Sequence, residues 1–331
     1  MFERSPTRRE IAVAAILLVI LVITLTPAAN GPPLQFSFEL GVGRHWLADA
    51  ILNLCMFVPL GLALAWNSRS PAKAVFCGLL LSTTVELAQM WIPGRDPSLS
   101  DIFSNTAGTT VGALIGLRPR AWLAPDARSS VTLTALGVAA ATLVMTLTAL
   151  LLAPEGPFAI SRAGSDLVLE YQSRADAAGL DKPVYWLAHA FPDSSSADTG
   201  SVSARRDRAR WYVSTPGKRA TLGPTVGEGW TLLAYPDAIA RRWGEALDAA
   251  WVFLLCLPIG FWARSRRALA VACVIVLVLF WLPGITGVVS TPPIEWIGAG
   301  LGFLAGALIG WSSRRVLHGP SEKISLSESR R

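Results

Sequence analysis

The chain has 331 residues, of which 52% are hydrophobic and only 16% are charged. Soluble domains carry about 25% charged residues, and the mean hydropathy here is +0.45. The composition therefore excludes an ordinary soluble protein and favours a membrane protein. Basic residues that flank apolar blocks account for the net charge of +6, so this charge orients helices in a membrane and does not indicate a nucleic-acid partner.

Eight apolar segments follow one another along the chain, each close to the length of a membrane-spanning helix. The first, 11–26, comes after a cluster of arginines and is compatible with either a cleaved signal peptide or an uncleaved span. Its length and the internal repeat described below favour the span. The other seven predicted spans are 47–66, 72–92, 101–116, 131–153, 246–263, 268–282 and 294–311.

The charges of the loops predict the orientation of these spans. Alternate loops, counted from the arginine-rich N-terminus, contain most of the basic residues, whereas the short loops on the other side contain Arg44 and Arg95 only. By the positive-inside rule, both termini are expected in the cytoplasm. The long polar tract 154–244 is then extracytoplasmic, and the protein is expected in the plasma or inner membrane.

The polar tract 154–244 predicts a small, mostly antiparallel β-rich domain. Short β-type runs bounded by Gly, Pro, Asp and Ser occupy 166–171, 183–188, 210–214 and 230–235. The tract contains no catalytic signature, and a lone histidine such as His189 is more often structural than catalytic. A binding or shielding role, including contact with a partner protein, is the expectation for this domain.

The later apolar segments repeat features of the earlier ones. At a constant offset, Asp49, Pro59 and Gly61 recur as Asp248, Pro258 and Gly260. The Gly-Ala-Leu-Ile-Gly run at 112–116 recurs at 306–310, which places Glu295 opposite Asp101. We therefore predict an all-α polytopic protein of two parallel four-helix repeats. Its parts are 1–117, the fifth span with its preceding loop at 118–153, the β-rich insertion 154–244, the second unit 245–312 and a cytoplasmic tail 313–331.

Seven polar residues distinguish the first unit. Their spacing of three or four residues places each pair on one face of its helix, and the predicted orientation brings three helices' pairs to the outer membrane boundary. A carboxylate at such a place is by default a functional-site hypothesis. Most of these positions are apolar in the second unit, so chemistry is expected in the first. The set is Asp49, Asn53, Glu86, Gln89, Arg95, Asp101 and Asn105.

The order and spacing of these residues resemble the VanZ-like family of membrane proteins over about 10–117. The matching motifs are Asp49-x3-Asn53-x5-Pro59-Leu-Gly61, Glu86-x2-Gln89, Arg95 and Asp101-x3-Asn105-x2-Gly108. The second unit looks like a degenerate copy, and the β tract lies outside the resemblance. The family is associated with resistance to the glycopeptide antibiotic teicoplanin, so the resemblance implies a role in the cell envelope.

Three functions remain open at this point. A membrane hydrolase or transferase acting on an envelope lipid would use Glu86 or Asp101 as acid/base and Arg95 for an anionic group. Asn53, Gln89 and Asn105 would orient the substrate. Oxygen ligands from Asp49, Glu86 and Asp101 would also suit a divalent cation.

The second function is binding of a lipid-linked or cell-wall-related ligand without catalysis, and the third is structural pairing of the polar residues across helices. The sequence has no Ser-His-Asp order, no phosphate loop and no Cys/His spacing typical of a metal site. We therefore favour binding over catalysis. The sequence specifies neither the ligand nor a cofactor.

Overall fold

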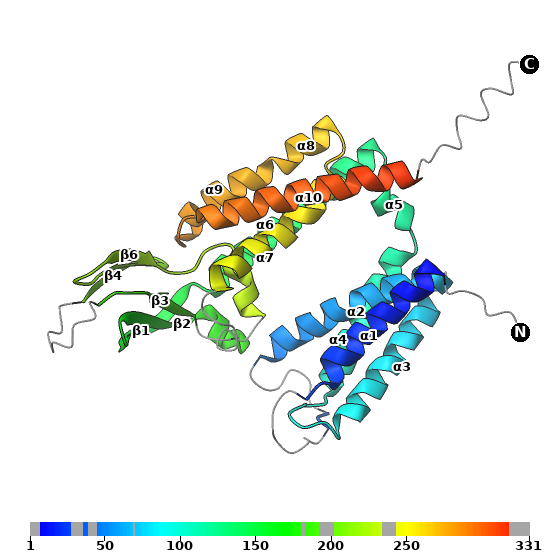
Figure 1. Cartoon of the computed structure of the whole chain (residues 1–331), viewed down its shortest axis with the longest axis horizontal. Helices are drawn as coiled ribbons and strands as arrows, with labels where there is room; N and C mark the ends of the chain where they lie inside the picture. The colour runs from blue at the N-terminus through cyan, green and yellow to red at the C-terminus, as the bar shows by residue number, and fades with distance from the viewer. Residues whose placement is uncertain are drawn as a thin grey trace, which may run out of the picture. The chain divides into compact units, whose positions relative to one another are not determined.

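The structure is a computed structural model that describes residues 7–27, 36–38, 45–68, 70–180, 183–191, 202–233 and 243–317. The chain divides into two compact units, Met1–Arg120 and Ala121–Arg331 (Figure 1). The first unit is helical. The second contains further helices together with the β-rich insertion.

The described part of the first unit contains the long helices α1 (Arg8–Leu25), α2 (Trp46–Ser68), α3 (Pro71–Gln89) and α4 (Leu99–Gly116). Their starts follow from local sequence. Thr7 and Glu10 form a capping box at α1, and the Ser70 and Ser98 side chains cap α3 and α4, since hydroxyls satisfy the unpaired N–H groups of a first turn. The short α5 (Pro119–Leu123) follows α4.

Glycines let α2 and α4 pack backbone to backbone. Gly108 and Gly112 lie directly against the carbonyls of Leu54 and Val58, and a Cβ at either glycine would overlap them. Small residues at four-residue steps permit this close approach between membrane helices. Helix α3 packs on the same α4, and α1 packs on α2 and α3. The polar ends of α2, α3 and α4 are thereby brought into one bundle.

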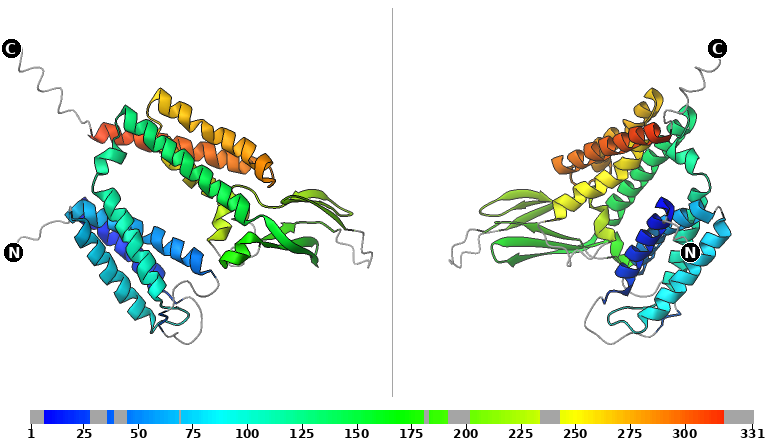
Figure 2. Two further views of the ribbon diagram at one scale, coloured as in Figure 1. Left: turned by 180° about the vertical axis from the view of Figure 1, so that it is seen from behind. Right: turned by 45° about the vertical axis from the view of Figure 1, so that its right-hand side comes forward.

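The second unit contains α6 (Ala127–Leu151), α7 (Gly244–Trp262), α8 (Arg266–Ala272), α9 (Val274–Thr286) and α10 (Pro293–Leu317). Figure 2 shows α8 and α9 following one another along nearly the same line. Helices α7 and α10 pack as α2 and α4 do, because Gly302 and Gly306 lie against the carbonyls of Phe253 and Leu257. These are the positions that the sequence alignment pairs with Gly108, Gly112, Leu54 and Val58.

The insertion forms two antiparallel three-stranded sheets. The first has the order β1 (Pro154–Ala163), β2 (Asp166–Ser173) and β3 (Val184–Leu187), and the second has β4 (Ser203–Asp207), β5 (Arg210–Ser214) and β6 (Arg219–Leu222). Alternate residues of β2 and β5 enter a shared core that includes Leu167, Leu169, Tyr171 and Trp211. The insertion also contains two short 3-10 helices. The first, η1 (Arg174–Ala178), follows β2, and the second, η2 (Glu228–Leu232), follows β6.

Three of the four expected strands are present, and one is wrong. The runs at 166–171, 183–188 and 210–214 coincide with β2, β3 and β5. The run at 230–235 does not form a strand: its first three residues belong to η2, and 234 and 235 lie outside the described residues. Trp230 and its neighbours turn here because they contact the helices, as described below, and do not pair with a sheet.

Six helices among the described residues are long and apolar enough to cross a membrane. They are α2, α3, α6, α7, the continuous stretch 266–286 and α10, while the apolar part of α1, Glu10–Leu25, is shorter. Eight spans were expected. The two predicted spans outside this set are α1, which is too short, and α4. Helix α4 is rich in Ser, Thr and Gly and carries Asp101 and Asn105, so its hydropathy is low. The described residues therefore provide six candidate spans, and eight remains a prediction.

Candidate functional site

Asn53 and Asp101 join α2 to α4 at one end of the first unit. The Asn53 Nδ2 donates a hydrogen bond of 2.7 Å to the Asp101 Oδ1. Asp101 lies in the first turn of α4, where its own N–H donates to the Ser98 Oγ at 3.1 Å. Two of the predicted site residues are therefore in direct contact, and the α4 cap fixes the position of one of them.

Glu86 lies beneath this contact and is almost completely buried, with 2% of its surface exposed. Its Oε2 accepts a hydrogen bond of 3.0 Å from the N–H of Ser98. The turn that carries Ser98 is also held by Ser37, which exchanges backbone hydrogen bonds with Pro97 and Leu99. Ser98 thus connects Glu86 to the start of α4, a role that the sequence patterns did not reveal.

Asn105 occupies the next turn of α4, one turn deeper than Asp101. Its Nδ2 donates a hydrogen bond of 3.0 Å to the Ser82 Oγ on α3. Asn105 is 1% exposed, and its Oδ1 has no partner among the described residues. A buried amide oxygen without a partner is costly, so simple packing does not account for an asparagine at this position.

Gln89 and Arg95 contact α1. The Gln89 Nε2 donates to the Thr24 carbonyl at 2.9 Å. Arg95 donates through Nε to the Thr26 carbonyl at 2.9 Å and also contacts the Ile23 carbonyl. The last carbonyls of a helix lack partners within it, so both side chains hold the C-terminal end of α1. The guanidinium that was expected to bind an anion is used here for helix docking.

Carboxyl groups from three helices converge at this end of the bundle. Asp101 lies within electrostatic range of Asp49 and Asp96, and Glu86 lies within range of Asp101 and Asp96. Asp49 is half-buried, and its side chain makes no hydrogen bond among the described residues, although His45 is near it. No three His, Cys, Asp or Glu side chains in the described ranges are placed to hold a metal ion, so a cation held by Asp49, Glu86 and Asp101 has no preformed ligand set.

The second unit contains a polar cluster that the sequence patterns did not predict. The Trp230 Nε1 donates a hydrogen bond of 2.7 Å to the Asp248 Oδ1, and the Thr225 hydroxyl donates to the Glu295 Oε1. Asp248 and Glu295 are the positions aligned with Asp49 and Asp101. Their partners come from the inserted segment Thr225–Leu232, which thus provides a hydrogen-bond donor to each acid.

Glu228 extends this cluster toward the β sheets. The Tyr185 hydroxyl donates to the Glu228 Oε2 at 2.6 Å. Burial raises the pKa of Glu228 well above its usual range, the nearby Asp248 and Glu295 raise it further, and the Tyr185 hydrogen bond opposes them. Glu295 is fully buried, and its Oε2 has no partner among the described residues. The cluster is therefore rich in carboxyl groups.

Arginines of the β-rich insertion also hold a helix end in the second unit. Arg210 donates to the carbonyls of Val288 at 2.7 Å and Pro283 at 3.2 Å, and Arg208 donates to Gly284 at 3.2 Å. These carbonyls lie at and just beyond the C-terminal end of α9. The insertion is thus tied to the helices of its own unit both at the end of α9 and at the Asp248–Glu295 cluster.

The aligned acids were the available signal for this second cluster. Asp248 and Glu295 keep their positions while their helical neighbours become apolar, which indicates that some other part of the chain contacts them. The Gly-rich polar run Thr225–Trp230 lies shortly before α7 in the sequence. Neither feature alone specifies the pairing, because the pairing depends on how the insertion folds back onto the helices.

Comparison with protein-family models finds a match to the first unit. Residues 6–119 match the VanZ/LLP1 family model, which covers the first unit and about a third of the chain. No significant match was found among curated proteins or among solved structures. The family match agrees with the resemblance carried by the polar motifs of α2, α3 and α4. Together with the six helices of the described ranges that could span a membrane, it points to a multi-pass membrane protein.

Proposed function

We propose that this multi-pass membrane protein, VanZ/LLP1-like over residues 6–119, binds a lipid-linked or cell-wall-related ligand through the polar end of its first unit. The observation that carries the proposal is the convergence of Asp49, Glu86 and Asp101 from three helices. Placing carboxylates together near a membrane is costly. Packing alone is a weak reason for it, since hydrogen bonds between membrane helices average only about 0.6 kcal/mol in one measured case.

The ligand that this site fits carries hydrogen-bond donors, such as hydroxyl, amide or ammonium groups. Carboxylates accept hydrogen bonds from such donors and do not attract an acidic group. Arg95, which could bind an acidic group, already donates to the end of α1. The second unit supports this inference, because its aligned acids accept from an indole N–H and a hydroxyl. The inserted segment there occupies the place that an external ligand would take in the first unit.

We also propose that the two units are copies of one four-helix design, related by an ancient duplication. The matching glycine contacts in α2–α4 and α7–α10 support this reading. Under the positive-inside rule the chain has eight spans, both termini are cytoplasmic, and the β-rich insertion is extracytoplasmic. The polar ends of both units then face the outer leaflet, where envelope precursors are assembled.

The geometry favours binding over catalysis. Glu86, one of the two acid/base candidates, is buried, and one of its oxygens is occupied by the Ser98 N–H. Asp101 is more accessible but shares its Oδ1 with Asn53. A membrane hydrolase or transferase would need one of these carboxyls to move a proton to the substrate. Turnover of a bound precursor by the purified protein would establish that alternative.

The test compares what co-purifies with the protein from its own membrane. The double variant Asp49→Asn/Asp101→Asn removes two negative charges and keeps the shape of both side chains. Glu245→Gln, an exposed acid in the first turn of α7, is the matched control. Mass spectrometry should detect an envelope species with wild type and the control but not with the double variant. Equal recovery from all three would contradict the proposal.

The cellular counterpart of this test is glycopeptide susceptibility, which the family resemblance suggests as the phenotype. Cells expressing wild type and Glu245→Gln should give the same susceptibility to teicoplanin. Glu86→Gln and Asp101→Asn should shift it to that of cells without the protein, at equal protein levels in the membrane. A shift caused equally by Glu245→Gln would assign the effect to general charge and not to the site.

A further inference from the structure

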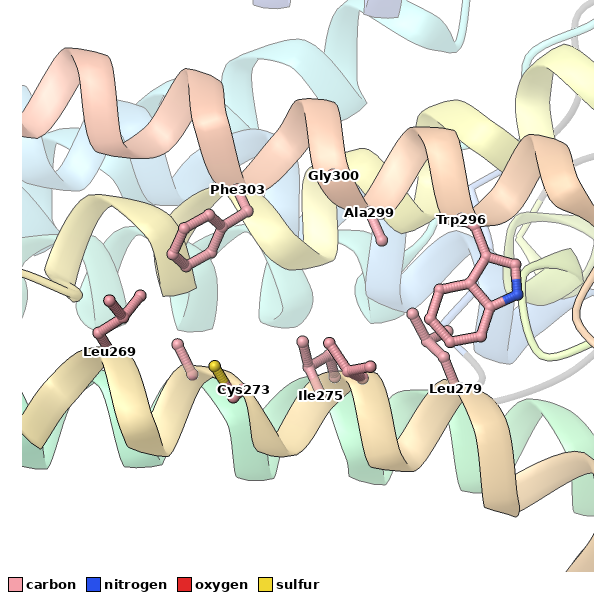
Figure 3. A pocket seen from close by; sticks show the side chains of 10 residues that line it. Leu269, Cys273, Ile275, Leu279, Trp296, Ala299, Gly300 and Phe303 are labelled. Atoms are coloured by element: carbon pink, nitrogen blue, oxygen red, sulfur yellow. The ribbon is translucent and has the colours of Figure 1, made fainter.

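A second feature of the chain, independent of the first unit's polar end, is an apolar groove between α8–α9 and α10. Its volume is about 250 Å³. Figure 3 shows Leu269, Cys273 and Leu279 on one helix facing Trp296 and Phe303 on the other. All ten residues that line it are apolar, glycine or cysteine. Both walls belong to helices capable of spanning a membrane.

The groove exists because the second unit has lost a helix contact that the first unit keeps. In the first unit, α3 and α4 are joined by the Ser82–Asn105 hydrogen bond, and Gly78 lies against the Thr109 side chain. The aligned residues in the second unit are Ala272 with Ala299, and Ala268 with Phe303. The hydrogen bond is therefore absent there, and a bulky phenylalanine replaces threonine. In the described part of the chain α9 packs mainly on α6.

The shape of the groove fits a single alkyl chain. From Leu269 to Leu279 the helix rises about 15 Å at 1.5 Å per residue, which is half of the ~30 Å hydrocarbon core and so the depth of one leaflet. Water does not fill a dry apolar cavity of this kind. An empty groove would also forfeit the van der Waals contacts of its walls. The surrounding membrane supplies alkyl chains in excess.

The charge at one end of the groove selects the head group. Arg266 and Arg267 are exposed and lie one turn before Leu269. Long basic side chains at a helix end extend to the membrane surface, where they attract anionic lipids. At the other end the groove is lined by Trp296, and the Thr291 hydroxyl nearby donates to the Leu279 carbonyl at 2.5 Å. The two arginines therefore favour a lipid whose head group lies at their end of the groove.

We propose that this groove is a binding site for one anionic phospholipid, with an alkyl chain between α9 and α10 and its phosphate beside Arg266 and Arg267. Under the orientation proposed above, the lipid belongs to the cytoplasmic leaflet. The site lies within the second unit and uses none of the carboxylates of the first. Its test and the test of the first unit's ligand site therefore fail or succeed separately.

Gly300 provides a selective variant. A Cβ on Gly300 meets no atom within 4 Å although the residue borders the groove, so Gly300→Leu fills the groove without displacing the backbone. Gly284→Leu is the matched control, because Gly284 also has no atom within 4 Å of a Cβ and lies on α9 outside the groove lining. Native mass spectrometry of detergent-purified protein, titrated with phosphatidylglycerol or phosphatidylcholine of identical chains, measures the bound lipid.

The wild type and Gly284→Leu should retain one phosphatidylglycerol, and Gly300→Leu should retain it roughly tenfold less well. Arg266→Gln/Arg267→Gln should lower phosphatidylglycerol retention to that of phosphatidylcholine. Equal retention by Gly300→Leu and wild type would overturn the groove as the site. Equal retention of both lipids by wild type would overturn the head-group assignment. Loss of a dimer in Gly300→Leu without loss of lipid would assign the groove to a second copy of the chain.

A labelling experiment checks the same proposal without a groove variant. Cys273 lines the groove, while Cys256 is buried. In the variant Cys55→Ala/Cys77→Ala, N-ethylmaleimide should modify Cys273 in detergent, and phosphatidylglycerol should slow this reaction more than phosphatidylcholine does. A modification rate that neither lipid changes would contradict occupation of the groove by a lipid chain.

Discussion

Arg95 gives the sharpest separation between a ligand-binding role and a structural one. The structure assigns its guanidinium to the Thr26 carbonyl, at 2.9 Å from Nε and 2.6 Å from a terminal nitrogen, and to the Ile23 carbonyl. A cation at a helix C-terminus contributes up to about 2 kcal/mol in partly buried sites. Because Arg95 is partly exposed, solvent screening reduces this to about 1 kcal/mol.

Arg95→Gln should therefore lower the melting temperature by about 4 °C, as expected for a loss of that size in a domain of roughly a hundred residues. Tryptophan fluorescence of the detergent-purified protein measures the transition. Lys73→Gln is the control, since Lys73 is exposed on α3 of the same unit. A surface substitution of this kind should change the free energy of unfolding by less than about 0.5 kcal/mol, so the melting temperature should change less than in Arg95→Gln. An unchanged melting temperature with loss of ligand binding would refute the docking role and return Arg95 to the ligand.

Three further predictions concern the insertion and the helix pairs. Trp230→Phe removes the 2.7 Å hydrogen bond to Asp248 and should destabilise the insertion by about 1–3 kcal/mol, measured as faster limited proteolysis of the β-rich domain. Because the folded-state pKa of Glu228 is raised, its protonation stabilises the fold below about pH 4 and this stability is lost as the pH rises through the raised value. Glu228→Gln should flatten the resulting dependence of melting temperature on pH. Gly112→Val should force α2 and α4 apart and cost about 1–3 kcal/mol or more, whereas Gly284→Val, with open space around its Cβ, should cost less than about 1 kcal/mol.

Local rules predicted most of the helices. The predicted segments 47–66, 101–116 and 294–311 lie within α2, α4 and α10. This works because a long apolar run leaves the backbone no alternative to a helix in a membrane. Hydropathy does not mark α4 as a span, since α4 combines glycines with Asp101 and Asn105 and packs closely on α2.

The sequence predicted that polar side chains of α2, α3 and α4 lie at one end of the first unit, but not which of them pair. Spacing placed Asn53 on one face with Asp49, and Asp101 on one face with Asn105, whereas the hydrogen bond joins Asn53 to Asp101. Spacing could not reveal that Gln89 and Arg95 hold α1, because that depends on where a neighbouring helix ends. The Trp230–Asp248 contact was out of reach for the same reason: it joins residues whose proximity depends on the fold of the insertion.

The most direct test of the central claim is an experimental structure of the protein purified from its own membrane, at a resolution that shows bound head groups. The account predicts density for a non-protein group within hydrogen-bond distance of the Asp49 and Asp101 carboxylates, with Glu86 buried beneath it. A structure in which these carboxylates contact only protein donors, or in which Glu86 faces lipid away from Asp101, would contradict it.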